Sequence, residues 1–202
     1  MSIRRARLAT HVIAILAVAA LGSGARAQLK KPTPPTPPPA PPAIDLLTFA
    51  HGALPVAATI DGKAQGVDLE GLVRASDGNP GRFSLVRAGN AKTVVELVYA
   101  LPAPTTFASF AVPEVAEVPS KHTTFVRQIE VHGSADGPDR GFALLASATL
   151  AVHTRPDELT VLAMTGKPAA VRWVKVRLSG GLDLPTGKAT LQFSELVGPG
   201  RQ

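Results

Sequence analysis

The sequence predicts an all-β domain, an antiparallel sandwich or barrel of about eight strands. Short apolar segments recur along the chain, and each is bounded by Gly, Pro, Asn or Asp residues that favour turns. No long segment shows the helical spacing of apolar residues together with capping residues. The predicted strands are 82–87, 93–101, 106–112, 124–132, 142–152, 158–164, 170–179 and 188–197.

The first 27 residues are typical of a secretory signal peptide. Arg4, Arg5 and Arg7 precede an apolar run over 12–21, and small residues around Ala27 mark the predicted cleavage site. An uncleaved N-terminal anchor is the alternative, but a membrane span needs about 20 apolar residues. We therefore expect an exported protein, periplasmic or secreted, with no transmembrane segment after cleavage.

The charge of the chain excludes some classes of partner. The formal net charge is +6, but four of the 21 basic residues lie in 1–27, which leaves 17 basic against 15 acidic residues and a net charge of +2. This balance gives no reason to expect nucleic acid as a partner. The chain has no cysteine, so a packed core must stabilise it without disulfides.

A proline-rich segment, 28–42, separates the signal from the domain. Eight of the eleven residues in 32–42 are proline, which favours extended polyproline II. It could act as a stiff N-terminal tail, as a spacer through the cell envelope, or as a ligand for a proline-reading domain. Residues 43–202 are enough for one domain and too few for two.

The segment 124–132 shows the two-residue strand period, with Val126, Gln128, Glu130 and His132 on one face and Ile129 and Val131 on the other. The break at 134–140 has turn chemistry in Ser134, Asp136-Gly137 and Pro138. We interpret this break as a scaffold hairpin with Asp139 and Arg140 in solvent.

Two aromatic residues lie within predicted strands. Trp173, the single tryptophan, shares a strand face with Lys175 and Arg177, while the valines and leucine of that segment form the other face. Tyr99 lies within 93–101. Aromatic residues at such positions usually cover a sheet or fill its core, so we assign neither a ligand.

The order of several motifs resembles the discoidin, or coagulation factor 5/8 type C, domain. The corresponding segments are "FAHGALPVAAT" (49–59), "ASDGNPGRFSLV" (75–86), "VVELVYALPAP" (94–104), "IEVHGSADGPDRGF" (129–142), "AAVRWVKVRLSG" (169–180) and "LQFSELVGPG" (191–200). The resemblance covers about 47–198. It implies a galactose-binding-like jelly roll, a fold that many bacterial carbohydrate-binding modules share.

Some members of that family hold a structural calcium between an early Asp-Gly turn and a late Glu. The resemblance places Asp77 and Glu195 in those roles, with main-chain carbonyls of Gly78 and Asn79 nearby. Calcium takes six to eight oxygen ligands. Arg82 replaces the usual hydroxyl residue, and its guanidinium would repel a cation or would itself pair with Asp77 or Glu195.

Sugar-binding members of the family use loops at one end of the sandwich, with an exposed aromatic residue and a few polar side chains. The polar candidates here are His51, Asn79, Arg82 and Lys121. The loops 61–71 and 112–122 contain no aromatic residue, and Phe83 and Phe107, near turns, fit buried strand ends equally well. Without a stacking face, sugar binding would be weak.

The sequence contains no catalytic motif, and we expect no enzyme. Cysteine is absent, and the histidines of 28–202 lie in no metalloprotease or nucleophile-elbow pattern. Our hypothesis is an exported, non-catalytic module that binds an envelope or extracellular carbohydrate. The alternative is a structural or protein-interaction domain of the envelope that has lost its sugar site.

Overall fold

The structure, a computed structural model, describes residues 44–65, 73–79, 86–89, 92–113, 117, 123–152, 155, 159–181 and 189–202. All of them belong to one compact unit, Pro41–Gln202. The predicted signal peptide and nearly all of the proline-rich segment lie outside this unit, and both lie outside the described residues.

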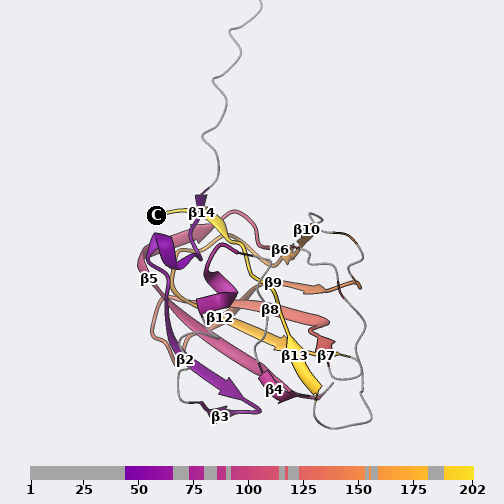
Figure 1. The fold of residues 1–202 in the computed structure, drawn as a ribbon. Helices are drawn as coiled ribbons and strands as arrows, with labels where there is room; N and C mark the ends of the chain where they lie inside the picture. Colours follow the sequence, from indigo (N-terminus) through magenta and orange to yellow (C-terminus); the bar gives the residue numbers. More distant parts are fainter. Residues whose placement is uncertain are drawn as a thin grey trace, which may run out of the picture. The chain divides into compact units, whose positions relative to one another are not determined.

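The largest sheet has the strand order β1-β14-β5-β12-β8-β9-β11; β2 also pairs with β5, and β3 pairs with β2 (Figure 1). Strand β5 has 13 residues, long enough to pair with β2 over its first half and with β14 at its end. The bounds are β1 (Ile44–Asp45), β2 (Leu54–Ile60), β3 (Lys63–Ala64), β5 (Val95–Phe107), β8 (Gln128–Ser134), β9 (Ala143–Thr149), β11 (Ala163–Met164), β12 (Val171–Ser179) and β14 (Pro199–Arg201).

Two smaller sheets complete the described structure. One has the order β4-β13-β7 and the other pairs β10 with β6. Their bounds are β4 (Val86–Gly89), β6 (Ala111–Pro113), β7 (Thr123–Phe125), β10 (Leu159–Val161) and β13 (Ala189–Gln192). Every described pairing is antiparallel except that of β13 with β7, which is parallel. The described helical elements are two 3-10 turns, η1 (Phe49–His51) and η2 (Arg74–Ser76).

The core lies between the large sheet and the β4-β13-β7 sheet. Val174 and Leu178 of β12 are fully buried, and Leu191 of β13 and Phe193 after it belong to the same apolar cluster. Burying such side chains contributes about 1.5–3 kcal/mol each. The predicted all-β sandwich is therefore confirmed, although two predicted strands are each divided, 124–132 into β7 and β8 and 158–164 into β10 and β11. The break predicted between 93–101 and 106–112 is wrong, because β5 runs without interruption through 102–105.

One residue of the 124–132 pattern lies on a different face from the predicted one. Gln128 to His132 alternate as predicted, but Val126 is buried and belongs to the core. The chain passes from one sheet to the other at this point, with the N–H of Val126 donating to Gln192 O and that of Arg127 to Ser179 O. The break between β7 and β8 interrupts the two-residue alternation of the strand, so Val126 lies on the core side and not on the face of Gln128.

Tyr99 and Trp173 lie as predicted in the large sheet. Tyr99 is buried in the core, and Trp173 is half-buried on the face that carries Lys175 and Arg177. The break at 134–140 is a hairpin between β8 and β9, with Asp139 and Arg140 exposed.

Candidate functional site

The turn after η2 forms the first half of the candidate site. Asp77 directly follows the 3-10 turn as its C-cap, and its Oδ1 accepts a hydrogen bond from the N–H of Asn79 at 2.8 Å. Gly78 has a φ of 79°, in the left-handed region that glycine adopts without steric cost. Its N–H therefore points out of the turn and can meet a group from another part of the chain.

That group is the carboxylate of Glu195. The N–H of Gly78 donates to Glu195 Oε1 at 2.6 Å, and the N–H of Leu196 donates to Ala75 O. Only 2% of Glu195 is exposed. The structure thus brings Asp77 and Glu195, which the family resemblance paired, to one corner of the domain.

Burial gives the Glu195 carboxyl unusual electrostatics. Its pKa is raised to about 7: loss of solvent is the largest cause, the negative charges of Asp45 and Asp77 also raise the pKa, and the hydrogen bond from Gly78 lowers it. Sequence reasoning missed Asp45. Its Oδ1 accepts from the N–H groups of Leu47 and Gly198, and so ties the first strand to the last.

A pair of buried hydroxyl groups lies beside the same corner. Ser76 and Tyr99 are both buried, and their side chains share a hydrogen bond. Burial is the main cause that raises the pKa of Tyr99 above its usual range, and the charge of Glu195 adds to it. The phenol is therefore neutral at physiological pH.

The carboxylate oxygens of Asp77 and Glu195 are of the kind that a hard cation such as calcium prefers. Among the residues that the structure describes, no three His, Cys, Asp or Glu side chains are grouped closely enough to form a metal site by themselves. Main-chain carbonyls would have to complete the coordination, as calcium permits. Arg82, whose guanidinium the sequence analysis expects to repel a cation, lies outside the described residues.

The predicted sugar contacts are described only in part. His51 ends η1 and is exposed, and its Nδ1 shares a 2.7 Å hydrogen bond with Thr48 Oγ1. Asn79 is exposed in the turn after η2. Arg82 and Lys121 lie outside the described residues.

An exposed aromatic residue that the sequence analysis missed lies next to His51. Phe49 begins η1, and 52% of its surface is exposed. Phe49 lies outside the loops 61–71 and 112–122, in a segment that resembles the first strand of the family. Phe49 followed two residues later by His51 was the feature of the sequence that could have indicated a sugar site at this turn.

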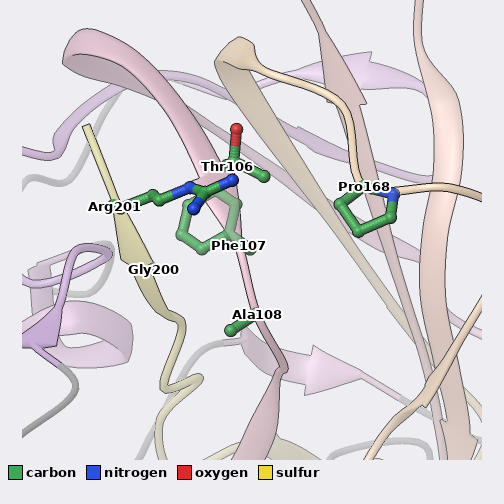
Figure 2. Close-up of a pocket in the computed structure, with 6 residues that line it drawn as sticks. All are labelled: Thr106, Phe107, Ala108, Pro168, Gly200 and Arg201. Carbon is green, nitrogen blue, oxygen red and sulfur yellow. The ribbon is translucent and has the colours of Figure 1, made fainter. Parts of the chain in front are cut away.

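A separate hollow of about 300 Å³ lies at the far end of β5. Figure 2 shows the six residues that line it: Thr106, Phe107, Ala108, Pro168, Gly200 and Arg201. Phe107 forms part of its floor, but the ring is 3% exposed and packs against Phe110 at 4.8 Å between centroids. Phe83, the other candidate aromatic residue, lies outside the described residues.

Within the described residues, no helix is long and apolar enough to cross a membrane. No protein-family model and no curated protein matches the sequence.

Two solved structures resemble the domain. One is a fragment of an assigned chitobiase from Bacteroides thetaiotaomicron, with a TM-score of 0.54, 15% identity, and coverage of 83% of this chain and 97% of that one. The other is CBM32-3, from a family 31 glycoside hydrolase of Clostridium perfringens, with a TM-score of 0.51, 13% identity, and coverage of 79% and 95%. The described domain therefore has the discoidin-like, galactose-binding-like fold that the motif order predicted.

Proposed function

We propose that the chain is an exported, non-catalytic module that binds carbohydrate of the cell envelope or of the extracellular space. The observation that carries the proposal is its fold likeness to a carbohydrate-binding module over 95% of that module's length. The predicted signal peptide supports export.

The η1 turn provides the best-defined sugar contacts. Phe49 offers an exposed ring against which the C–H face of a pyranose can stack. The hydrogen bond between Thr48 and His51 Nδ1 orients the imidazole, so that Nε2 can bond a sugar hydroxyl. Asn79, Arg82 and Lys121 remain proposed polar contacts.

Calorimetry with simple sugars and peptidoglycan fragments tests the proposal, after a glycan array has selected the strongest ligand. Phe49→Ala should weaken binding by about fivefold or more, because an aromatic contact contributes about 1 kcal/mol or more. His51→Ala should weaken it as well. Val152→Ala is the matched control, since Val152 is also an exposed apolar residue, at 61%.

Single alanine variants of Asn79, Arg82 and Lys121 test the other contacts separately, and a variant that binds normally removes its residue from the site. The absence of binding heat with every saccharide would contradict the carbohydrate proposal. Turnover of a glycoside or ester by the purified protein would contradict the non-catalytic part.

A second candidate function is protein interaction in the envelope, favoured by the exposed apolar residues of β10. Leu159 and Val161 are 60% and 65% exposed on this three-residue strand, which pairs with β6. Association through this strand predicts a partner that Leu159→Ser releases in a pull-down. Capture that survives this change, together with heat from a saccharide, would favour carbohydrate binding alone.

We also propose a structural calcium at the corner, with Asp77 and Glu195 as its carboxylate ligands. The proximity of Glu195 to Asp45 and Asp77 supports this, because a divalent cation would relieve the repulsion between these acids. A cation there would tie the early turn to the last segment of the chain.

A further inference from the structure

The hollow at the end of β5 has a chemistry unlike that of a sugar site. Its floor and walls consist mainly of Phe107, Ala108, Pro168 and Gly200. Two of its lining residues, Thr106 and Arg201, have polar side chains. A volume of about 300 Å³ is within the range of small-ligand pockets, and so is an apolar lining with a few fixed polar groups.

The pairing of β5 with β14 places the two polar side chains together. Arg201 lies directly opposite Thr106 in this antiparallel pair, so both side chains project from the same face of the sheet. Figure 2 shows the Arg201 side chain reaching toward Thr106, with Pro168 on the other side of the hollow.

Close backbone contact fixes this geometry. A Cβ on Gly200 would lie 2.6 Å from Thr106 O, so glycine lets β14 approach β5 more closely than any other residue could. The Phe107 ring packs against the ring of Phe110. The floor of the hollow and the base of Arg201 are thus parts of one rigid strand pair.

The charged side chains of the segments that form the hollow are all basic. The segments that form it, 102–108, 165–172 and 198–202, contain Lys167, Arg172 and Arg201 and no Asp or Glu. The nearest carboxylate on the adjacent strand, that of Asp45, accepts hydrogen bonds from two main-chain N–H groups. No hydrogen bond or ion pair joins the Arg201 guanidinium to another described residue.

We propose that this hollow binds a small monocarboxylate with an apolar body. Arg201 pairs with the carboxylate, Thr106 Oγ1 donates a second hydrogen bond, and the apolar body covers Phe107, Ala108 and Pro168. A guanidinium fits a carboxylate with two parallel hydrogen bonds. A sugar acid fits less well, because an apolar floor would leave its hydroxyl groups without partners. The proposal is independent of the carbohydrate function.

An NMR titration of the ¹⁵N-labelled protein with benzoate and with hexanoate tests it. We expect saturable shifts of the Ala108, Gly200 and Arg201 amides, with dissociation constants of about 1–10 mM for ligands of this size. Benzyl alcohol and hexanol, which lack the carboxylate, should bind at least about tenfold more weakly.

Three variants locate the site. Arg201→Gln should raise the dissociation constant about tenfold or more. Ala108→Leu should abolish binding by filling the hollow while it keeps the charge. Arg140→Gln removes a guanidinium from the β8–β9 hairpin and should bind like the wild type. Spectra of each variant without ligand show whether its fold is kept.

Linear, non-saturating shifts of the wild type, or equal affinity of Arg201→Gln and wild type, would overturn the proposal. Equal affinity for galacturonate and benzoate at these amides would overturn the preference for an apolar body. None of these three results would affect the proposal of sugar binding at η1, which calorimetry with the Phe49→Ala variant tests separately.

Discussion

Gly78 donates its N–H to Oε1 of Glu195 at 2.6 Å, across 117 positions of sequence. This contact joins an early turn to the last segment of the domain, and the buried acid that it holds is repelled by the negative charges of Asp45 and Asp77. The Glu195 carboxyl therefore has two opposite effects on stability. Its hydrogen bond to Gly78 connects two distant parts of the chain, whereas its negative charge, when ionised, is buried and is repelled by Asp45 and Asp77. Three predictions separate these two effects.

Replacement of Glu195 tests the structural connection. At pH 5, where the wild-type carboxyl is protonated, Glu195→Ala should lower the free energy of unfolding by about 2 kcal/mol, because it removes the acceptor for Gly78 and leaves a cavity. Glu195→Gln keeps an oxygen acceptor of the same size and should stay within about 1 kcal/mol of wild type. Urea unfolding measures both, and equal stability of the Ala and Gln variants would rule the connection out.

The raised pKa of Glu195 predicts a pH dependence. In chelator, the native state holds this proton more tightly than the unfolded state, whose carboxyl has the ordinary glutamate pKa of 4.5. The stabilising contribution is complete below pH 4.5 and is lost as the pH rises through about 7. The loss by pH 8 is about 3 kcal/mol.

Comparison with Glu195→Gln isolates this dependence from other titrating groups. The difference between the free energies of unfolding of wild type and variant should change across this pH range, with the variant gaining relative to wild type as the pH rises. A difference that stays constant from pH 4 to pH 8 would show that Glu195 has an unshifted pKa.

Calcium should reverse the effect of pH. The ion needs the ionised carboxylate, so calcium at about 10 mM should raise the melting temperature more at pH 8 than at pH 5. Asp77→Asn and Glu195→Gln should both abolish the rise, while Asp139→Asn, on the exposed hairpin, should keep it. Identical melting of the wild type in calcium and in chelator would remove Asp77 and Glu195 as ligands.

The hairpin between β8 and β9 should depend on Ser134. Its buried hydroxyl donates to Arg140 O at 2.6 Å and accepts from the N–H groups of Asp136 and Gly137. Ser134→Ala removes the partner of these three backbone groups, of which the N–H of Gly137 is buried, and should cost about 1–3 kcal/mol of stability. Asp139→Ala serves as the control in the same thermal melts. Loss of stability without loss of ligand binding would agree with a scaffold role.

The residues of the candidate site that could be predicted are those whose local sequence indicates a turn or the end of a strand. The Asp77-Gly78 turn and the late Glu195 appear in the sequence as a turn and a strand end, and motif order paired them. Asp45 and Arg201 were missed because their surroundings come from pairings between strands of two or three residues, such as β1 with β14, and from the contact of Arg201 with Thr106. Strands that short show no period.

The short strand β14 supplies the last prediction. A Cβ at position 200 would lie 2.6 Å from Thr106 O and 3.2 Å from Phe107 Cα, which are backbone atoms of β5 that cannot rotate away. Gly200→Ala should therefore push β14 off β5, cost about 1–3 kcal/mol, and displace Arg201 from Thr106. Gly137→Ala is the matched control, because its nearest contacts are flexible atoms of Asp139 and Arg140. Wild-type amide shifts at Phe107 and Arg201 in the Gly200→Ala variant would contradict the close approach of the two strands.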